Sequence, residues 1–594
     1  MIRTQRSCPE HALRPRRRRP PRSPQRGRVG PALTRERRAQ LRLVPLAGYT
    51  AGMLGTMMET PLTLAPLLAR AGRLFGRRSI VSRLPDRSLH RYTYSEMHRR
   101  ALALAEALAR AGVRPGDRVA TLMWNHYVHL EAYFGIPCAG AVLHTLNLRL
   151  HPDQLSFIAN DGGARILIID DILLPAFEAW RSRARFERVV VAPLACGAVP
   201  AGYESYEDFI AGASGTFEPP LMSERDACGM CHTSGTTGDP RGVVYTHRST
   251  VLHCLAIGLV DAVAIGHHDT LLPVVPMFHV NAWGLPYAAV MTGARLVFPG
   301  PHLDPGSLLE LFEDERVTLT AGVPSIWIRI LEALDREPER WKLPPMRMVV
   351  GGSAAPESLI RGFDRHGQTV IHAWGMTETS PVGTVARPKA DLESESADER
   401  YRLRATQGLP VPLIDVRIVG DSGEAPHDGK HMGELQVRGP WVAGAYFGGL
   451  HGSHQPDKFT NDGWFRTGDV ATIDAEGYVK LTDRTTDLIK SGGEWISSVD
   501  LENALMGHPA VREAAVVAIQ HPTWGERPLA VVVVRDDAAI TPDMLRAHLA
   551  PRFPKWWLPD GFAFVQEIPK TSAGKFLKSE LRARFAAWRP DVTP

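Results

Sequence analysis

The chain has 594 residues, of which 44% are hydrophobic and 22% are charged, a composition typical of a soluble globular protein. This length exceeds what one hydrophobic core usually serves and predicts about three or four structural units. No run of about 18 uninterrupted apolar residues suits a membrane span. The best candidate, residues 251–266, contains His253 and Asp261, so we expect a buried helix there.

The net charge of +5 comes from one end of the chain. Residues 1–52 hold fourteen Arg, no Lys and two Glu, a net charge of +12, which leaves −7 for residues 53–594. Because the body is mildly acidic, we expect no nucleic-acid partner. The head has little apolar periodicity and no apolar signal core, which predicts disorder. It is a transit-like or basic interaction tail, an extension without function, or the result of a misassigned start codon.

Residues 62–170 alternate between helix-like and strand-like segments. Helices are expected at 96–111 and 126–140, and strands at 118–123 and 165–170. These strands are too apolar to face water, so they predict a layered α/β structure.

Six cysteines in a chain of this length do not make a disulfide framework, which favours a reducing, cytoplasmic compartment. Cys228-Gly229-Met230-Cys231-His232 matches the pattern of c-type haem attachment, which requires an exported chain. A covalent haem would also block the loop that follows His232. We therefore expect Cys228 and Cys231 to be small buried residues.

A loop at 233–242 is rich in glycine and hydroxyl groups and precedes the strand-like Val243-Val244-Tyr245. Its glycines let the backbone approach an anion, its hydroxyls donate hydrogen bonds, and Arg241 adds a fixed positive charge. The residues concerned are Thr233, Ser234, Gly235, Thr236, Thr237, Gly238, Arg241 and Gly242. This combination suits a polyphosphate, although no Gly-Lys-Ser/Thr closes the loop as in P-loop NTPases.

Strand and helix signals continue to alternate after this loop. A helix is expected at 249–264, capped by Ser249 or Thr250, and further helices at 305–315, at 324–334 and from Pro356. The expected strands are 270–275, 294–298, 317–323 and 346–350. His279 and Trp283 follow the first of these strands, and the carboxyl ends of strands in open α/β sheets are where ligands bind.

Two later stretches combine bare backbone, an aromatic ring and a carboxylate. Gly351-Gly352-Ser353-Ala354-Ala355-Pro356 ends a strand and leaves room for a flat ring against bare backbone. His372-Ala373-Trp374-Gly375-Met376-Thr377-Glu378-Thr379 places an aromatic ring near a carboxylate. Beside a polyphosphate, one carboxylate is enough to bind Mg²⁺, because the ion keeps most of its waters and phosphate ligands.

The last third of the chain predicts two smaller units. Residues 388–402 are polar and acidic and predict an exposed loop, while short β segments at 407–478 predict a small distorted barrel carrying Trp464-Phe465-Arg466-Thr467-Gly468-Asp469. After Asp483-Arg484 and Gly492-Gly493-Glu494-Trp495-Ile496, a compact α/β unit is expected. Its helices are predicted at 499–506 and 541–550, its strands at 513–519 and 529–534, and it ends in Pro569-Lys570-Thr571-Ser572-Ala573-Gly574-Lys575.

Taken in order, these motifs resemble those of the AMP-forming acyl-CoA synthetases, the adenylate-forming superfamily, over residues 55–590. The run ending in Gly-Glu-Trp-Ile-Ser is most similar to the medium- and long-chain fatty-acyl branch. The resemblance favours Met53 as the true start. It implies an N-terminal AMP-binding domain at 53–482 of layered α/β subdomains plus the barrel at about 407–480, and a mobile α+β C-terminal domain at 483–594, hinged at Asp483.

The resemblance also implies a role for each motif. His279 would lie beside the substrate carboxylate, Trp283 would gate the acyl tunnel, and Lys575 would neutralise charge during adenylation. Around ATP, the loop 233–242 would bind the phosphates, and Gly352, Ser353 and Ala354 would lie along adenine, with Trp374 stacked on it. Thr377 would reach the α-phosphate, and Glu378 and Thr233 would bind Mg²⁺. Asp469 would bind ribose, and Gly375, Met376 and Arg484 would also contact the nucleotide. Gly492, Gly493, Glu494 and Trp495 would meet coenzyme A.

The implied reaction has two steps. A fatty carboxylate attacks the α-phosphorus of Mg-ATP to give acyl-AMP and pyrophosphate, and coenzyme A then takes the acyl group. Peripheral membrane contact and a homodimer are left open. The alternatives are a ligase that loads a carrier protein and a nucleotide-binding regulator without catalysis. Two residues depart from the family pattern: Arg241 stands where Lys is usual, and His232 where an aromatic residue is usual.

Overall fold

A computed structural model describes residues 56–195, 197–233, 240–448, 457–492, 494–535, 538–571 and 575–588. The chain divides into Met1–Thr60 and Pro61–Pro594, and the fold described below belongs to the second part. The predictions for the basic head and for residues 234–238 and 493 lie outside the described residues. Among the helices of these ranges, none has both the length and the apolar character of a membrane span.

Two large sheets form the body of the molecule, and most of their strand pairs are parallel. In order across the seven-stranded sheet, the strands are β7 (Glu204–Ser205), β6 (Arg188–Ala192), β5 (Ile166–Asp170), β3 (Arg118–Leu122), β4 (Val142–Thr145), β8 (Ala227–His232) and β9 (Gly242–Thr246). In order across the nine-stranded sheet, they are β16 (Leu409–Pro410), β15 (Val382–Val385), β14 (Thr369–Gly375), β13 (Arg347–Val350), β12 (Leu319–Gly322), β10 (Thr270–Pro273), β11 (Arg295–Phe298), β1 (Ser79–Arg83) and β2 (Leu89–Thr93).

Helices cover these sheets and bury their central strands on both faces. All five residues of β5 are buried, for example. The α-helices of the body are α1 (Leu64–Leu74), α2 (Tyr94–Arg110), α3 (Tyr127–Cys138), α4 (Pro152–Gly162), α5 (Leu174–Glu178), α6 (Tyr206–Ile210), α7 (His247–Gly258), α8 (Leu285–Thr292), α9 (Pro305–Asp314), α10 (Pro324–Arg336), α11 (Glu357–Arg365) and α12 (Ala397–Ala405). Short 3-10 turns lie at Asp171–Leu173, Arg181–Arg183, Val280–Gly284, Thr377–Thr379, Ala390–Leu392 and Lys555–Trp557.

Two smaller five-stranded sheets complete the fold. The first runs β18 (Gly423–Glu424), β17 (Asp415–Gly420), β19 (Gly433–Arg438), β20 (Phe465–Ile473) and β21 (Val479–Arg484), all antiparallel. The second contains β23 (Glu494–Ile496), β22 (Ile489–Ser491), β25 (Gly525–Val534) and β24 (Val511–His521), with β26 (Gly561–Phe564) beside β25. It packs with α13 (Ser498–Met506), α14 (Pro542–Leu549) and α15 (Lys578–Arg584).

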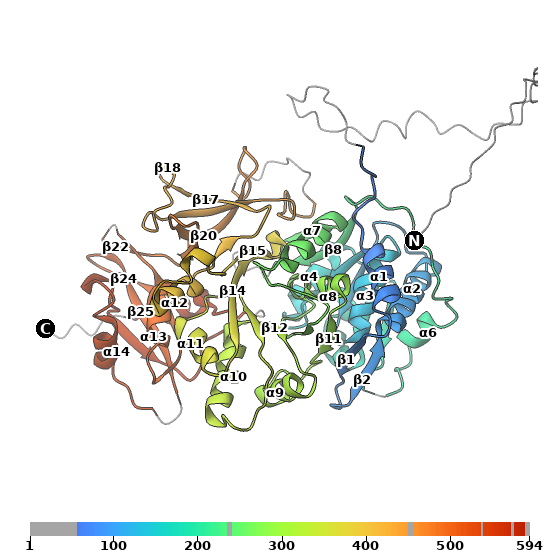
Figure 1. Ribbon diagram of the computed structural model, residues 1–594, viewed down its shortest axis with the longest axis horizontal. Helices are drawn as coiled ribbons and strands as arrows, with labels where there is room; N and C mark the ends of the chain where they lie inside the picture. The colour runs from blue at the N-terminus through green and yellow to red at the C-terminus, as the bar shows by residue number, and fades with distance from the viewer. Residues whose placement is uncertain are drawn as a thin grey trace, which may run out of the picture. The chain divides into compact units, whose positions relative to one another are not determined.

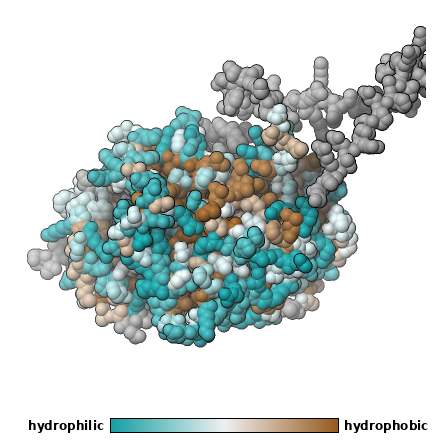
Figure 2. Space-filling model, viewed as in Figure 1, coloured by the Kyte–Doolittle hydropathy of each residue, from teal (hydrophilic) through white to brown (hydrophobic). Residues whose placement is uncertain are grey.

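Figure 1 shows how residues 61–594 are arranged. The second five-stranded sheet and its helices lie at one end, in red, and α1, α2 and β1 lie at the other, in blue. The first five-stranded sheet lies beside the nine-stranded sheet, near β15. In Figure 2 most of the visible surface is hydrophilic, with a band of apolar surface across this face. Leu255, Leu259 and Val260, at the end of α7, are among the exposed large apolar residues.

The layered α/β architecture with a small C-terminal α+β unit is confirmed, as are the strands and helices predicted between residues 96 and 170. The domain boundary at 482/483 stays a prediction. In the region predicted as a barrel, the described pairs form the five-stranded sheet β18–β21. A bridge between Gly408 and Val479 joins β21 to the approach to β16.

Two predictions of local structure were wrong. The helix predicted at 249–264 is α7, which begins at His247 and ends at Gly258, because Leu259 is extended. Its cap is Thr246, which accepts the Ser249 amide, so Ser249 lies one turn inside the helix. The segment predicted as an exposed loop at 388–402 includes most of α12, whose cap is Ser396.

Helix α12 forms where composition alone favoured a loop because its single aromatic residue, Tyr401, finds partners on α11. The Tyr401 ring lies 3.9 Å from the guanidinium carbon of Arg361, and its hydroxyl donates to Asp364 at 2.8 Å. Contacts with α11, about forty residues earlier, therefore stabilise a helix whose own sequence is polar.

Gly408 is a position where a side chain cannot be accommodated. Its φ is +84°, and a Cβ there would lie 2.1 Å from the backbone of Val385 on β15. We expect Gly408→Ala to destabilise the protein by about 3 kcal/mol or more, since left-handed strain and a clash with immobile backbone add together. Gly112 is the matched control: its φ is +79°, but a Cβ there would meet nothing within 4 Å.

Thermal unfolding of both alanine variants checks this expectation. Gly112→Ala should lose about 1–2 kcal/mol from backbone strain alone. Equal losses in melting temperature for the two variants would show that the approach of Val385 does not restrict this position.

Candidate active site

The parallel strands of the nine-stranded sheet bring several predicted residues to one edge. The carboxyl ends of β10, β12, β13 and β14 lie at the same edge, and the residues that follow them line a cavity of about 450 Å³. From these ends come Val275 and Pro276, Val323, Gly351 and Gly352, and Met376. This edge is where the sequence predicted ligand binding.

Strand β14 has no room for a side chain at its last residue, Gly375. A Cβ on Gly375 would lie 1.9 Å from the carbonyl oxygen of Pro381. This close approach folds the chain back, so that Thr377 and Glu378 both line the 450 Å³ cavity. The Tyr245 hydroxyl on β9 donates to the Thr377 carbonyl at 2.9 Å and connects the turn to the seven-stranded sheet.

The base of the glycine-rich loop is held by a pair of hydrogen bonds. The Thr233 amide donates to the Arg241 carbonyl at 2.9 Å, and the Arg241 amide donates to the Thr233 hydroxyl at 3.1 Å. Both residues line the 450 Å³ cavity. Ser234, Gly235, Thr236, Thr237 and Gly238 lie between them, outside the described residues.

A second cavity of about 300 Å³ shares Gly352, Trp374 and Lys575 with the first. Ser353, Ala354 and Asp469 line this second cavity. The Trp374 indole donates to Asp469 Oδ2 at 2.9 Å, and this hydrogen bond fixes the orientation of the ring. Arg484 Nε lies 3.4 Å from Asp469 Oδ1, across the β20–β21 pair. The structure therefore brings the sequence motifs of β14, β20 and β21 together in one place.

Lys575 comes from the C-terminal unit and lines both cavities. Its backbone pairs with Thr571, which donates its amide to the Lys575 carbonyl at 2.7 Å. Burial, and then the positive charge of Arg484, lower the pKa of the Lys575 ammonium to about 8, against the attraction of Asp469 and Glu378. The lysine is thus held among charges of both signs.

His279 and Trp283 line the 450 Å³ cavity, as do the apolar residues Val275, Val280 and Val323. Burial, followed by the charges of Lys575 and Arg149, lowers the pKa of His279 to about 4, so the ring is neutral at pH 7. Trp283 belongs to a left-handed turn that includes Asn281 and Ala282, with φ near +50°. Its ring reaches Gly351, where a Cβ would lie 3.2 Å from it.

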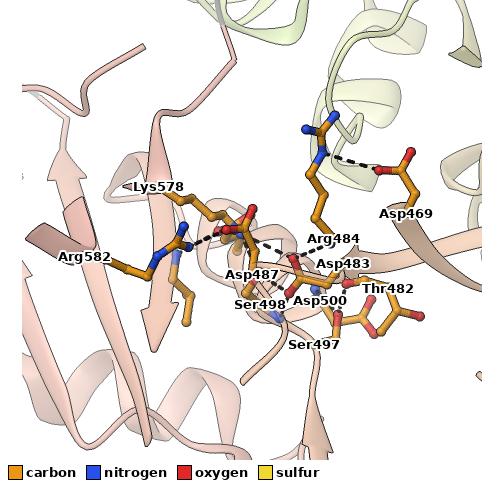
Figure 3. A network of polar contacts seen from close by, with 12 residues as sticks. Asp469, Thr482, Asp483, Arg484, Asp487, Ser497, Ser498, Asp500, Lys578 and Arg582 are labelled. Atoms are coloured by element: carbon orange, nitrogen blue, oxygen red, sulfur yellow. Dashed lines mark hydrogen bonds and ion pairs between the residues drawn. The ribbon is translucent and has the colours of Figure 1, made fainter. Parts of the chain in front are cut away.

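Asp483, the predicted hinge, is only 4% exposed and lies in a network of polar contacts (Figure 3). Its carboxylate accepts from the Ser498 amide at 2.9 Å and also from the Ser498 hydroxyl. Lys578 Nζ lies 3.9 Å from Asp483 and 2.7 Å from Glu502. Burial is the largest influence on the pKa of Asp483 and raises it, while Lys578 opposes this. Asp483 is therefore held in place from both α13 and α15.

Two of the residues predicted to meet coenzyme A lie outside the two cavities. Gly492 and Trp495 belong to the β22–β23 hairpin, and neither lines the two cavities. Trp495 is 39% exposed and lies beneath Lys490, whose Nζ is 5.2 Å from the ring. Gly493 and the Glu494 side chain lie outside the described part.

The sequence analysis missed several cavity residues. They include Tyr446, Lys458 and Thr467 in the first cavity, and Glu502 and Lys578 in the second. Tyr446 follows a glycine-containing loop, and Lys578 follows Lys575 by three residues, but neither has a local pattern that signals a contact with a distant segment.

The Cys-x-x-Cys-His segment is part of β8, as expected for buried residues. Cys228 and Cys231 are each 1% exposed, and burial raises the pKa of their thiols to about 12 and about 11. His232 Nε2 lies 2.9 Å from Asp161 and its Nδ1 lies 3.1 Å from His144. Both ring nitrogens of His232 are thus engaged by neighbouring side chains.

The family comparison agrees with this geometry. A model described as AMP-binding enzyme matches residues 69–447, and one described as AMP-binding enzyme C-terminal domain matches residues 500–575. The chain belongs to the AMP-binding enzymes. These are the adenylate-forming superfamily, the family that the sequence motifs resembled.

Relatives and solved structures cover nearly the whole of this AMP-binding enzyme. It is 52% identical to a long-chain-fatty-acid–CoA ligase of Thermus thermophilus over 89% of this chain and 97% of that protein. It is 42% identical to a medium-chain-fatty-acid–CoA ligase of Ectopseudomonas oleovorans over 90% of this chain and 98% of that protein. The crystal structure of an anthranilate CoA ligase in complex with anthranoyl-AMP matches with a TM-score of 0.79 and 25% identity, over 90% of this chain and 99% of that one.

We expect Trp374→Phe to weaken AMP binding by this AMP-binding enzyme about tenfold, because Asp469 would lose a hydrogen-bond donor to its charged carboxylate. Isothermal titration calorimetry with AMP measures the change. Trp180→Phe is the matched control, since that indole is buried in another core cluster and its nitrogen has no acceptor among the described residues. Equal affinities for wild type and Trp374→Phe would contradict the expectation.

Proposed function

We propose that this AMP-binding enzyme activates a medium- or long-chain fatty acid with ATP and transfers the acyl group to coenzyme A. The observation that carries the proposal is the cavity where Arg241, Arg484 and Lys575 meet next to Trp374. Three cations beside an aromatic ring fit a nucleoside triphosphate. The names of the relatives in Thermus thermophilus and Ectopseudomonas oleovorans support the acid and the thiol.

The first step must turn a carboxylate into an electrophile. A carboxylate oxygen attacks the α-phosphorus, a new P–O bond forms, and the bond from that phosphorus to the bridging oxygen breaks to release pyrophosphate. Negative charge develops on the phosphates, so fixed cations and amides that face them lower the barrier. In our proposal Lys575 and Arg241 supply this charge, and Asp469 with Arg484 holds the ribose side.

The residues present fit the predicted Mg²⁺. Glu378 and Thr233 offer hard oxygen ligands to the same cavity. The described residues contain no cluster of three His, Cys, Asp or Glu that could hold a metal, so phosphate and water would complete the ligand set. When bound, Mg²⁺ would neutralise phosphate charge. The contribution of the protein is to hold Glu378 in place.

The part of the cavity lined by His279 and Trp283 is proposed to take the acyl chain. His279 is neutral at pH 7 and can donate a hydrogen bond to the acid without adding a charge. The ring of Trp283 lies against Gly351 in the same cavity, which suits the predicted role of a gate. A panel of acids of different lengths would measure how long an acyl chain can pass the Trp283 ring.

In the second step the thiolate of coenzyme A attacks the acyl carbon, the bond from that carbon to the AMP oxygen breaks, and AMP leaves. Lys575 occupies the cavity in this structure, so we assign the present arrangement to the first step. A movement about Asp483 would withdraw Lys575 and bring the β22–β23 hairpin, with Gly492 and Trp495, toward the site. Mg²⁺, the homodimer, peripheral membrane contact and the cytoplasmic location stay predictions.

The test is acid-dependent ATP–pyrophosphate exchange over a panel of carboxylic acids, followed by thioester formation with coenzyme A. Lys575→Ala should lower the exchange rate at least about a hundredfold, because it removes a charge aimed at the transition state. Lys555→Ala is the control, since Lys555 is exposed and lies away from both cavities. A near-normal exchange rate in Lys575→Ala would remove this residue from the catalytic role.

The same assay separates the alternatives. Exchange without a thioester to coenzyme A would favour a carrier-protein ligase. A wild-type protein that shows no exchange with any acid would favour a regulator that binds nucleotide without catalysis.

The pH dependence follows from the lowered pKa of Lys575. The ammonium is charged below about pH 8 and neutral above it, so kcat/KM for ATP should fall as the pH rises through about 8. Lys575→Arg keeps its charge throughout this range, so any activity that it retains should lack the decline. An unchanged alkaline decline in Lys575→Arg would assign the ionisation to another group.

A further inference from the structure

Residues 439–447, between β19 and β20, connect the two sides of the proposed phosphate site. The Ala443 amide donates to the Glu378 carbonyl at 2.7 Å, and the Phe447 amide donates to the Gly242 carbonyl at 2.8 Å. The Ser380 hydroxyl donates to the Trp441 carbonyl at 2.7 Å. One segment is therefore fastened both to the turn that carries Glu378 and to the strand that follows Arg241.

Tyr446 of this segment contacts both functional groups with its side chain. Its hydroxyl donates to Glu378 Oε1 at 2.7 Å, and its ring lies 5.2 Å from the guanidinium carbon of Arg241. The residue is 5% exposed, and all three side chains line the 450 Å³ cavity. Tyr446 lies more than sixty residues from Glu378 in sequence and about two hundred from Arg241.

These contacts limit how the carboxylate and the guanidinium can lie. Glu378 is 6% exposed, and a carboxylate so far from water needs a donor. Since Oε1 accepts the Tyr446 hydroxyl, Oε2 can face a cation in the cavity. The ring face of Tyr446 attracts the guanidinium of Arg241, an interaction typical of separations within about 6 Å.

We propose that Tyr446 is a positioning residue for the metal–triphosphate. Its hydroxyl holds the Glu378 carboxylate for the metal, and its ring holds Arg241 for the phosphates, so that both groups meet the ligand together. This inference rests on the proposed function and adds a residue to it. Tyr446 itself need not touch the substrate.

Tyr478 provides a matched control in the same part of the fold. It is 1% exposed, its hydroxyl donates to the Arg387 carbonyl at 3.0 Å, and it accepts the Lys389 amide at 2.9 Å. It does not line either cavity. Tyr478→Phe therefore removes a hydroxyl with comparable structural contacts and no predicted contact with nucleotide.

The experiment compares Tyr446→Phe, Tyr446→Leu and Tyr478→Phe by isothermal titration calorimetry, without any acid, so that no turnover occurs. The ligands are ATP with Mg²⁺, ATP with a chelator, and AMP. Tyr446→Phe should weaken binding of ATP with Mg²⁺ about tenfold, since a donor to a charged group is lost. Its binding of AMP should be unchanged. Tyr446→Leu should also weaken binding of ATP in the presence of the chelator, because the guanidinium of Arg241 loses its contact with the aromatic ring.

Two activity measurements complete the test. In exchange assays Tyr446→Phe should need about tenfold more Mg²⁺ for half-maximal rate. Its rate of thioester formation from synthetic acyl-AMP and coenzyme A should equal that of wild type, since that step uses no triphosphate. Tyr478→Phe should match wild type throughout.

Two results would overturn the inference. One is wild-type affinity of Tyr446→Phe for ATP with Mg²⁺. The other is an equal loss for AMP, for the thioester step and for ATP with Mg²⁺, which would mean that the hydroxyl only stabilises the fold. If wild type shows no exchange with any acid, the proposed function fails, whereas the calorimetric comparison of Tyr446 variants still stands.

Discussion

The site depends on keeping charged side chains at low exposure without leaving any of them uncompensated. Glu378 and Asp469 are each 6% exposed, and each accepts a hydrogen bond from an aromatic side chain. Lys575 lies within the electrostatic influence of both carboxylates and of Arg484. A buried charge without a partner would cost more free energy than most folds can lose. The cavity thus has cations ready for an anionic ligand while its own charges are balanced.

The sheet topology explains how segments far apart in sequence reach this cavity. Parallel pairing of β10, β12, β13 and β14 brings four loops to one edge of the nine-stranded sheet. The antiparallel β8–β9 pair brings Thr233 and Arg241 from the seven-stranded sheet, and β20–β21 brings Asp469 beside Arg484. The C-terminal unit supplies Lys575 and, through Lys578 and Ser498, holds Asp483 (Figure 3). Each part of the fold therefore contributes at least one polar group to the site.

Much of this could be predicted from the sequence because the information is local. Apolar runs such as Ile166–Asp170 predict buried strands, and motifs such as Trp374-Gly375-Met376-Thr377-Glu378 carry several site residues in one short segment. Features that depend on distant contacts could not be predicted. Helix α12 depends on Tyr401 meeting Arg361 and Asp364. The role of Tyr446 depends on the contact between the segment that joins β19 to β20 and the turn after β14. The left-handed run from Val280 to Gly284 also has little sequence signal, because only its last residue is a glycine.

The buried cysteines have a practical consequence for studying motion. Cys138, Cys228, Cys231 and Cys254 are all buried, and burial raises the pKa of each thiol, so little reactive thiolate exists near neutral pH. Maleimide dyes should therefore leave them unmodified in the folded protein. Once Cys8 and Cys196 are replaced, two surface cysteines introduced on either side of Asp483 could carry a fluorophore pair. Energy transfer between the dyes would then test whether the C-terminal unit moves about Asp483 during turnover.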